Sequence, residues 1–422
     1  MMTGKPTTMI PIFILHTWLF GLVSLGMIGG AVYLGHEWQR RCWGWDPVAQ
    51  KSVFEPHFGW NSDTALLAAW VVLTVVALFG GALIRGILQL TRNRKIPDTE
   101  PDISLEPAAR QRLRRPDGSE LEVEFYGPEE ATPIVLTHGW GLHGAEWNYL
   151  KRELAGRFRL IAWDEPGLGK STRPSNRDYS LENLATDLDA VLALAGDKPA
   201  ILLGHSIGGM IILTFCRLFP DALGSRVLGL VLTHTTPTNP VRTTSGAALY
   251  SAIEKPVLVP LMYVTIALSP LVWLMNWLSY RNGTAHLSTM RSSFGGTESW
   301  SQLEFATQFQ VKASPAVLAR GMLAMMRYDA TKTLCDIEVP TLVVSGNKDG
   351  VTKPEASEVI RAAIPGAQLL MLAPAKHLGL IEHHEKYAIA VRDFVFAAQA
   401  KFNDRNVAIP MHPSRIPRTS AA

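Results

Sequence analysis

The 422-residue chain contains little cysteine and little net charge, and each scarcity excludes a class of protein. Its three cysteines, Cys42, Cys216 and Cys335, are odd in number and widely spaced, which excludes a disulfide framework and a cysteine metal cluster. The formal net charge is only +3, so nothing suggests the basic surface that a nucleic-acid partner requires. We therefore expect no metal, no cofactor and no nucleic-acid partner.

Charged residues are also missing from two long apolar stretches near the N-terminus. No Asp, Glu, Lys or Arg occurs from Ile10 to Leu34 or from Thr64 to Ile84, and each stretch reaches the roughly 20 residues that span a bilayer. A signal peptide is the alternative for the first stretch, but its apolar region would cover only about 7–15 residues and end at small residues. We predict a membrane anchor over residues 1–95, with transmembrane helices at about 10–34 and 64–84.

Basic residues beside the two spans predict their orientation. The chain after the second span carries Arg85, Arg92, Arg94 and Lys95. The loop between the spans carries Arg40, Arg41 and Lys51. This small excess favours the cytoplasm for the C-terminal side, because basic residues accumulate on the cytoplasmic side of a membrane. We expect a multi-pass membrane protein with residues 36–63 outside and with the N-terminus, the linker at Arg92 to Lys95 and the hydrolase in the cytoplasm. Gly26 and Gly30 would let the two spans pack closely.

The most informative motif combines a strand, a one-residue turn and a helix around a serine. Ala200 to Leu203 is an apolar run, and Gly204 and Gly208 then flank Ser206 in the pattern G-x-S-x-G. So tight a turn holds the serine in a strained backbone conformation in which bulkier neighbours would clash. The motif predicts that Ser206 presents a nucleophilic hydroxyl.

The partners that a serine nucleophile needs follow two later strands. The hydroxyl requires a histidine as general base, and the histidine requires a carboxylate to orient it. Asp349 follows the strand predicted at 340–345, and His377 follows the one predicted at 368–372. We predict Ser206, Asp349 and His377 as a catalytic triad, in the chain order of one serine hydrolase architecture.

An oxyanion hole is predicted from two backbone N–H groups. One belongs to Ile207, directly after the nucleophile, and the other to Trp140, in the glycine-rich loop that follows the strand predicted at 133–137.

From about Leu121 to Ala398 the chain resembles the α/β-hydrolase superfamily. The motifs that carry the resemblance are His138-Gly139-Trp140, Asp164 to Ser171, Gly204 to Gly209, Gly346 to Asp349, and His377 with Leu380 to His383. The resemblance implies an α/β fold with a mostly parallel eight-stranded sheet, helices on both faces, a lid after the sixth strand, and hydrolysis through an acyl-enzyme. Relatives that open epoxides or remove halide use aspartate as the nucleophile, so Ser206 argues against both reactions.

The expected domain order is a linker over 96–120, the hydrolase domain over 121–400 with a lid at about 236–330, and a disordered tail over 401–422. Within the lid, residues 257–280 are mostly apolar, and we predict that Trp273 and Trp277 contact substrate. A third span over residues 256–278 is the alternative. Two prolines interrupt that stretch, and a span there would place the triad residues on opposite sides of the bilayer.

We expect a membrane-anchored serine hydrolase that cleaves a hydrophobic carboxylic ester, either a small molecule or a lipid, as a carboxylesterase or a lipase of the monoacylglycerol type. Membrane lipid is the expected partner. Two alternatives stay open: a carbon–carbon bond hydrolase or haloperoxidase-like enzyme with the same triad, and a membrane-tethered binding protein without turnover.

Overall fold

The computed structural model describes residues 11–91 and 105–407, and its C-terminal part is built on one eight-stranded sheet. The strand order is β10-β9-β8-β7-β5-β6-β4-β3. The strands are β3 (Ala109–Arg114), β4 (Glu120–Tyr126), β5 (Pro133–Thr137), β6 (Arg159–Trp163), β7 (Ala200–His205), β8 (Val227–Thr233), β9 (Thr341–Gly346) and β10 (Gln368–Leu372). Strand β4 pairs antiparallel with β3 and β6, and all other pairs are parallel, so the sheet is mostly parallel, as the resemblance implies.

Helices cover both faces of the sheet, because the central strands are apolar on both sides. Along β7, Leu202 packs into the core on one face, while Ile201 and Leu203 pack into the core on the other. The first core is closed by α4 (Leu181–Leu192), α5 (Ile207–Leu218) and α13 (Pro354–Ala363). The second is closed by α3 (Asn148–Leu154) and α15 (His384–Val407). The short helix α14 (Gly379–Glu382) precedes α15.

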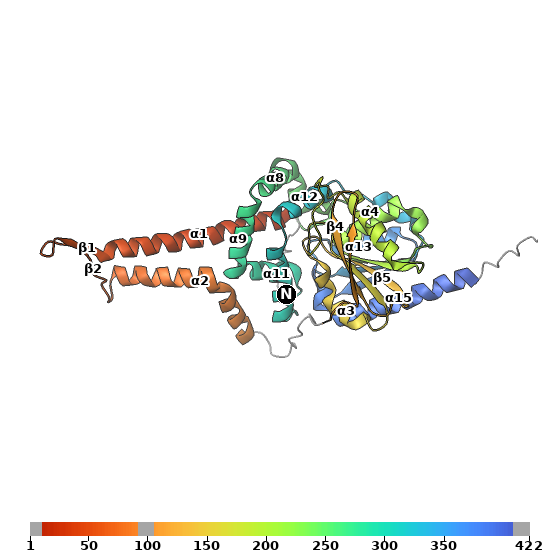
Figure 1. Cartoon of the computed structure of the whole chain (residues 1–422), viewed down its shortest axis with the longest axis horizontal. Coiled ribbons are helices and arrows are strands. Elements are labelled where there is room, and N and C mark those ends of the chain that lie inside the picture. Colours follow the sequence, from red (N-terminus) through yellow and green to blue (C-terminus); the bar gives the residue numbers. More distant parts are fainter. Residues whose placement is uncertain (1–10, 92–104, 408–422) are drawn as a thin grey trace, which may run out of the picture.

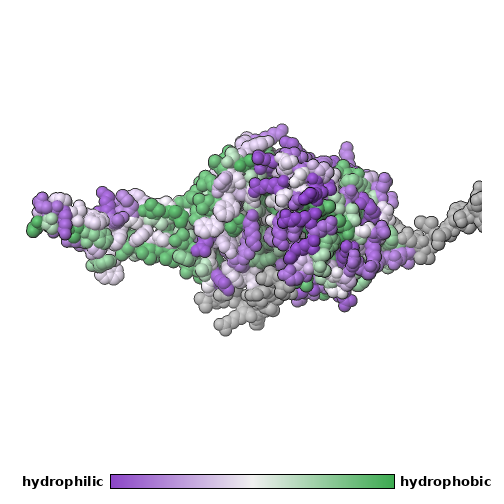
Figure 2. All heavy atoms as spheres, in the orientation of Figure 1, coloured by the Kyte–Doolittle hydropathy of each residue, from purple (hydrophilic) through white to green (hydrophobic). Residues whose placement is uncertain are grey.

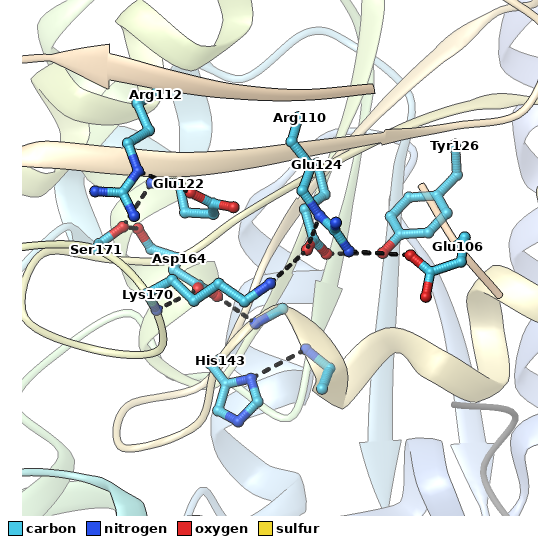
Figure 3. Close-up of polar contacts among 12 residues, drawn as sticks. Glu106, Arg110, Arg112, Glu122, Glu124, Tyr126, His143, Asp164, Lys170 and Ser171 are labelled. Carbon is cyan, nitrogen blue, oxygen red and sulfur yellow. Dashed lines mark hydrogen bonds and ion pairs between the residues drawn. The ribbon is translucent and has the colours of Figure 1, made fainter. Parts of the chain in front are cut away.

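The linker predicted over 96–120 contributes a strand to the sheet, which corrects the expected start of the hydrolase domain at 121. Arginines of β3 face glutamates of β4, with Arg112 Nε 3.4 Å from a carboxylate oxygen of Glu122 and Arg110 Nε 3.3 Å from one of Glu124 (Figure 3). This edge strand is charged and mostly exposed, so it lacks the alternating apolar residues that signal a half-buried strand.

The lid lies between β8 and β9 and consists of helices. They are α6 (Pro240–Thr243), α7 (Ala247–Ile253), α8 (Val259–Ala267), α9 (Ser269–Arg281), α10 (Thr284–Ser293), α11 (Trp300–Lys312) and α12 (Pro315–Met325). The stretch 256–278 is divided at Leu268, where α8 ends and α9 begins. By length and composition, three helical segments of the described residues are apolar enough to cross a membrane: residues 14–42, 62–87 and 247–267.

The N-terminal part is a helical hairpin that projects from the lid (Figure 1). It consists of α1 (Pro11–Cys42), β1 (Trp43–Asp46), β2 (Lys51–Phe54) and α2 (Ser62–Thr91). Apolar residues gather on the hairpin and on the adjoining edge of the lid (Figure 2).

The two hairpin helices do not meet at Gly26, which corrects the expected glycine packing. A Cβ added at Gly26 would have no neighbour within 4 Å, whereas one at Gly30 would lie 3.1 Å from Leu73 and one at Gly35 2.8 Å from Trp70. At the other end of the chain, residues 401–407 of the predicted tail continue α15, and the remainder of the tail lies outside the described residues.

Candidate active site

Ser206 stands at a sharp turn between β7 and α5, as the motif predicts. Its φ is +54° and its ψ is −116°, a backbone conformation that residues other than glycine rarely adopt. A Cβ at Gly204 would lie 2.4 Å from the backbone of Gly208, and one at Gly208 would lie 2.3 Å from the carbonyl oxygen of Thr137. The two glycines therefore allow the helix to approach the strand closely enough to form this turn.

The side chains of Ser206, Asp349 and His377 meet at the carboxyl edge of the sheet. His377 Nδ1 lies 2.9 Å from Asp349 Oδ2, and His377 Nε2 lies 3.1 Å from Ser206 Oγ. When Nδ1 donates to the carboxylate, Nε2 is left as the acceptor for the serine hydroxyl. This is the geometry that a hydroxyl needs to lose its proton to histidine.

The Asp349 carboxylate is fully enclosed by donors. Its Oδ1 accepts the backbone N–H groups of Val351 and Thr352 at 2.8 and 3.1 Å, and Thr352 Oγ1 donates to Oδ2. Burial raises the pKa of Asp349, but the charge of His377 and hydrogen bonds from His234 and His377 outweigh burial and hold this pKa well below its ordinary value. Asp349 is therefore ionised across the neutral range.

His234 is a second histidine on Asp349 that the sequence interpretation missed. It follows β8 directly, has a φ of +47°, and places Nδ1 3.1 Å from Asp349 Oδ2. Burial lowers the pKa of His234 and outweighs the Asp349 carboxylate, which raises it, so that the pKa is about 4. The ring is therefore neutral at pH 7. Its position at a strand end is the same signal that identified Asp349 and His377.

A buried carboxylate, Glu146, connects the oxyanion loop to the histidine of the triad. Glu146 Oε2 accepts the N–H of Gly139 at 2.9 Å, and its Oε1 lies 2.5 Å from His205 Nδ1. His205 Nε2 lies 3.1 Å from the carbonyl oxygen of His377. Burial raises the pKa of Glu146, but the charge of the adjacent His205 and the hydrogen bond from the Gly139 N–H bring it below the ordinary value. This chain of contacts fixes the loop and the base relative to each other.

The predicted oxyanion donors lie beside the serine. Ile207 is the first residue of α5, so its N–H has no partner inside the helix, and neither it nor the N–H of Trp140 has an acceptor among the described residues. The Trp140 indole donates to the carbonyl of Leu318 in α12 at 3.0 Å. The loop is also held by His138, which contacts the carbonyl of Gly139 through Nδ1 and accepts the N–H of Glu165 through Nε2.

A cavity of about 200 Å³ opens above Ser206 and His377. Its apolar wall comes largely from the lid, where it includes Met262, Phe309, Leu318, Met322 and Met325. Hydroxyl groups of α10 line another part of it, at Ser288, Thr289, Ser292 and Ser293.

Trp273 and Trp277 do not line this cavity, which corrects the predicted substrate contacts. They are 45% and 38% exposed, and the Trp273 indole donates to the carbonyl of Val311. The helix α9 is apolar on more than one face. Its Val272 and Met275 are buried, and Asn276 and Ser279 reach the cavity.

The donor atoms of His234, Asp349 and His377 lie within 4.8 Å of one another, close enough for one metal ion to reach all three residues. An ion bound there would replace the hydrogen bond between His377 and Asp349, and it would therefore compete with the arrangement that links His377 to Ser206.

Comparison with known families gives a match to the alpha/beta hydrolase fold over residues 132–252 and 265–384, more than half of the chain. Two similar proteins are pimeloyl-[acyl-carrier protein] methyl ester esterases. The one from Neisseria meningitidis is 27% identical over 268 residues, covering 64% of this chain and 95% of the relative. The one from Xanthomonas axonopodis pv. citri is 27% identical over 275 residues, covering 65% and 98%.

Solved structures show the same fold. A thermophilic esterase from Thermogutta terrifontis has a TM-score of 0.56 and 26% identity, and the match covers 69% of this chain and 99% of that one. A membrane phospholipase A has a TM-score of 0.56 and covers 79% of this chain and 97% of that one. Its identity is 21%, so this likeness concerns the fold alone.

Proposed function

Since this chain belongs to the α/β-hydrolase family, we propose that it is a membrane-anchored serine esterase that hydrolyses hydrophobic carboxylic esters through an acyl-enzyme. The observation that carries the proposal is the pair of contacts made by His377, 3.1 Å to Ser206 Oγ and 2.9 Å to Asp349 Oδ2, at the floor of a largely apolar cavity.

In the proposed reaction, Ser206 Oγ attacks the ester carbonyl carbon while its proton passes to His377 Nε2. The carbonyl oxygen becomes an oxyanion that the N–H groups of Trp140 and Ile207 stabilise. Asp349 keeps Nδ1 of His377 as a donor and stabilises the imidazolium. The tetrahedral intermediate then collapses, and the alcohol leaves with the proton from Nε2. A water molecule activated by His377 hydrolyses the acyl-enzyme, which releases the acid and restores Ser206.

The cavity lining supports an uncharged, apolar substrate. The cavity-lining residues that the structure describes include no Asp, Glu, Lys or Arg. A phosphate or carboxylate on the substrate would therefore find no cationic side chain in the cavity, and burying such a charge unpaired is unfavourable. Methionine and aromatic side chains suit an acyl chain instead, because each buried methylene contributes about 0.8 kcal/mol. We propose a carboxylesterase or a lipase of the monoacylglycerol type.

The exposed apolar hairpin supports membrane anchoring. Leu19, Leu22 and Val32 on α1, and Val72 and Phe79 on α2, are each more than half exposed. In water this surface would be unfavourable, whereas in a bilayer it would lie in its preferred environment.

Replacement of the nucleophile tests the enzymatic proposal. In the full-length protein, Ser206→Ala should lower kcat for p-nitrophenyl butyrate by about a millionfold, the loss seen when a serine protease loses its nucleophile. It should also abolish labelling by a fluorophosphonate. The control is Ser293→Ala, a serine in the same cavity whose hydroxyl lies 3.0 Å from that of Ser292. Substantial esterase activity in Ser206→Ala would refute the assignment.

A further inference from the structure

The first described turns of α1 form one wall of the cavity above Ser206. Ile14, His16, Thr17 and Phe20 line it together with the catalytic residues. Their spacing places them on one side of the helix, whereas Leu19 lies on another side and is 56% exposed. The helix predicted as a membrane anchor thus brings side chains to the reacting centre.

Specific contacts hold α1 against the lid. A Cβ at Gly21 would lie within 2.7 Å of the Met275 side chain, so only glycine allows this approach. The Trp18 indole donates to Thr265 Oγ1 at 2.9 Å, and Ser24 Oγ lies 3.0 Å from Ser279 Oγ. Small residues and interhelical hydrogen bonds are the contacts that associate helices in a bilayer. The wall is therefore part of the folded structure.

If the hairpin crosses a bilayer, the cavity lies where the hairpin leaves the apolar part of that bilayer. From the start of α2 at Ser62 to Gly80, which meets the lid at Asn282, the helix rises about 27 Å, close to the roughly 30 Å hydrocarbon thickness. In Figure 1, α9 crosses the base of the hairpin at this level. Its exposed Trp273 and Trp277 suit the membrane–water interface. The ester groups of membrane lipids lie at the same depth.

We propose that the N-terminal end of α1 is part of the substrate site, and that Thr17 and Phe20 contact the acyl chain of an uncharged lipid ester that enters from the bilayer. This inference rests on the serine esterase function proposed above. It assigns the anchor a role in substrate selection that is separate from tethering.

A pair of bulky substitutions in the full-length protein tests the wall. Thr17→Trp fills the cavity, whereas Leu19→Trp adds the same side chain on an exposed side of the helix. We expect Thr17→Trp to lower the ratio of kcat/KM for p-nitrophenyl dodecanoate to that for the acetate by about tenfold, the effect of displacing about two buried methylenes. Leu19→Trp should leave this ratio within about twofold of the wild type. An unchanged ratio in Thr17→Trp overturns the proposal.

A protection experiment does not depend on how well the tryptophan is tolerated. Thr17→Cys and Leu19→Cys are prepared with Cys335→Ser, because Cys335 is the exposed native cysteine, while Cys42 and Cys216 are buried. Prior reaction of Ser206 with a dodecyl fluorophosphonate should slow maleimide labelling at position 17 by about tenfold or more, and a methyl fluorophosphonate should not. The labelling rate at position 19 should be unchanged by either fluorophosphonate. Equal labelling rates at position 17 overturn the proposal.

The two proposals fail in different ways. If wild-type protein neither hydrolyses the acetate ester nor reacts with either fluorophosphonate at Ser206, the esterase function itself is wrong. If it does both and position 17 is insensitive to chain length, only the role of α1 is wrong.

Discussion

Asp349 Oδ2 accepts hydrogen bonds from both His377 and His234, so the orientation of the triad carboxylate depends on two rings. His234 is fully buried. The next residue, Thr235, holds the turn after β8, because its Oγ1 donates to the carbonyl of Ser206. His234 does not touch the reacting atoms. It acts as a positioning residue through Asp349.

Two replacements of His234 should show whether its hydrogen bond to Asp349 supports activity. His234→Ala should lower kcat for p-nitrophenyl butyrate by about tenfold, because a hydrogen bond to a charged group contributes about 1.5 kcal/mol. His234→Asn should keep most of the activity, since its amide can donate to Asp349 and asparagine tolerates positive φ. His383→Ala is the control, because that ring contacts the carbonyl of Pro374. Equal activities of the Ala and Asn variants would contradict this role.

The same variants should change the response to acid. The pKa of His234 is lowered to about 4 in the folded state, so between pH 6.5 and 4 the unfolded chain binds a proton that the folded protein does not. Stability should therefore fall as pH falls through this window, by at most about 1.4 kcal/mol per pH unit from this group. Thermal unfolding in detergent should show a shallower loss in both variants, and an unchanged slope would contradict the assignment.

The sequence was sufficient to bring Ser206, Asp349 and His377 together, because each follows a strand and parallel strands end at one edge of a sheet. His234 shows the same signal. Glu146 carries no such signal, since it lies in a short helical turn and meets His205 only through tertiary packing.

At the scale of elements, the junction between the hairpin and the lid is built from close backbone contacts. A Cβ at Gly80 of α2 would lie 2.3 Å from the carbonyl oxygen of Asn282, at the end of α9. Asn282 in turn donates to Ser24 Oγ of α1 at 2.8 Å. Both hairpin helices are thus joined to one turn of the lid.

Two glycine substitutions should distinguish this junction from the rest of the hairpin. Gly80→Ala places a methyl group against backbone that cannot rotate away, so it should lower the thermal midpoint and displace the lid. Gly26→Ala meets no atom within 4 Å and should be neutral or stabilising, since alanine favours a helix over glycine by about 1 kcal/mol. Thermal unfolding in detergent measures both. Equal destabilisation by the two variants would show that the junction is not specific.

The predictions about elements failed where one amino-acid pattern is compatible with two structures. The apolar stretch of α9 lies between β8 and β9, but Trp273 and Trp277 lie on an exposed side because Val272 and Met275 occupy the buried one. Strand β3 was missed because its arginines pair with β4 glutamates rather than with apolar neighbours.

At the scale of the whole molecule, both base ends of the hairpin lie at the hydrolase, and the turn with β1 and β2 lies at the far end (Figure 1). If α1 and α2 cross a bilayer, the hydrolase and the start of α1 therefore lie on one side, and residues 43–61 lie on the other. The sequence predicted two spans and their order. Nothing in the sequence indicated that α1 reaches the cavity, because threonine and phenylalanine, as at Thr17 and Phe20, are ordinary residues in any apolar helix.

Cysteine labelling in intact cells should reveal this orientation. Val48→Cys places a thiol at a position that is 93% exposed in the turn, and native Cys335 is exposed in the hydrolase. A membrane-impermeant maleimide should label Val48→Cys in intact cells, and Cys335 only after lysis. Labelling of Cys335 in intact cells would reverse the predicted topology and leave the proposed chemistry untouched.

The contacts between α1 and the lid also constrain the order in which the protein can be completed during synthesis. The partners of Trp18 and Ser24 lie 247 and 255 residues further along the chain. At ribosomal rates of about 5–20 residues per second, α1 emerges roughly 10 to 50 seconds before these partners exist. During that time the Ser24 hydroxyl lacks its lid partners, whereas its bond to the carbonyl of Phe20 lies within its own helix. A nascent chain therefore has α1 long before it has a closed pocket, and its active site is complete only after the lid and then Asp349 and His377 have been made.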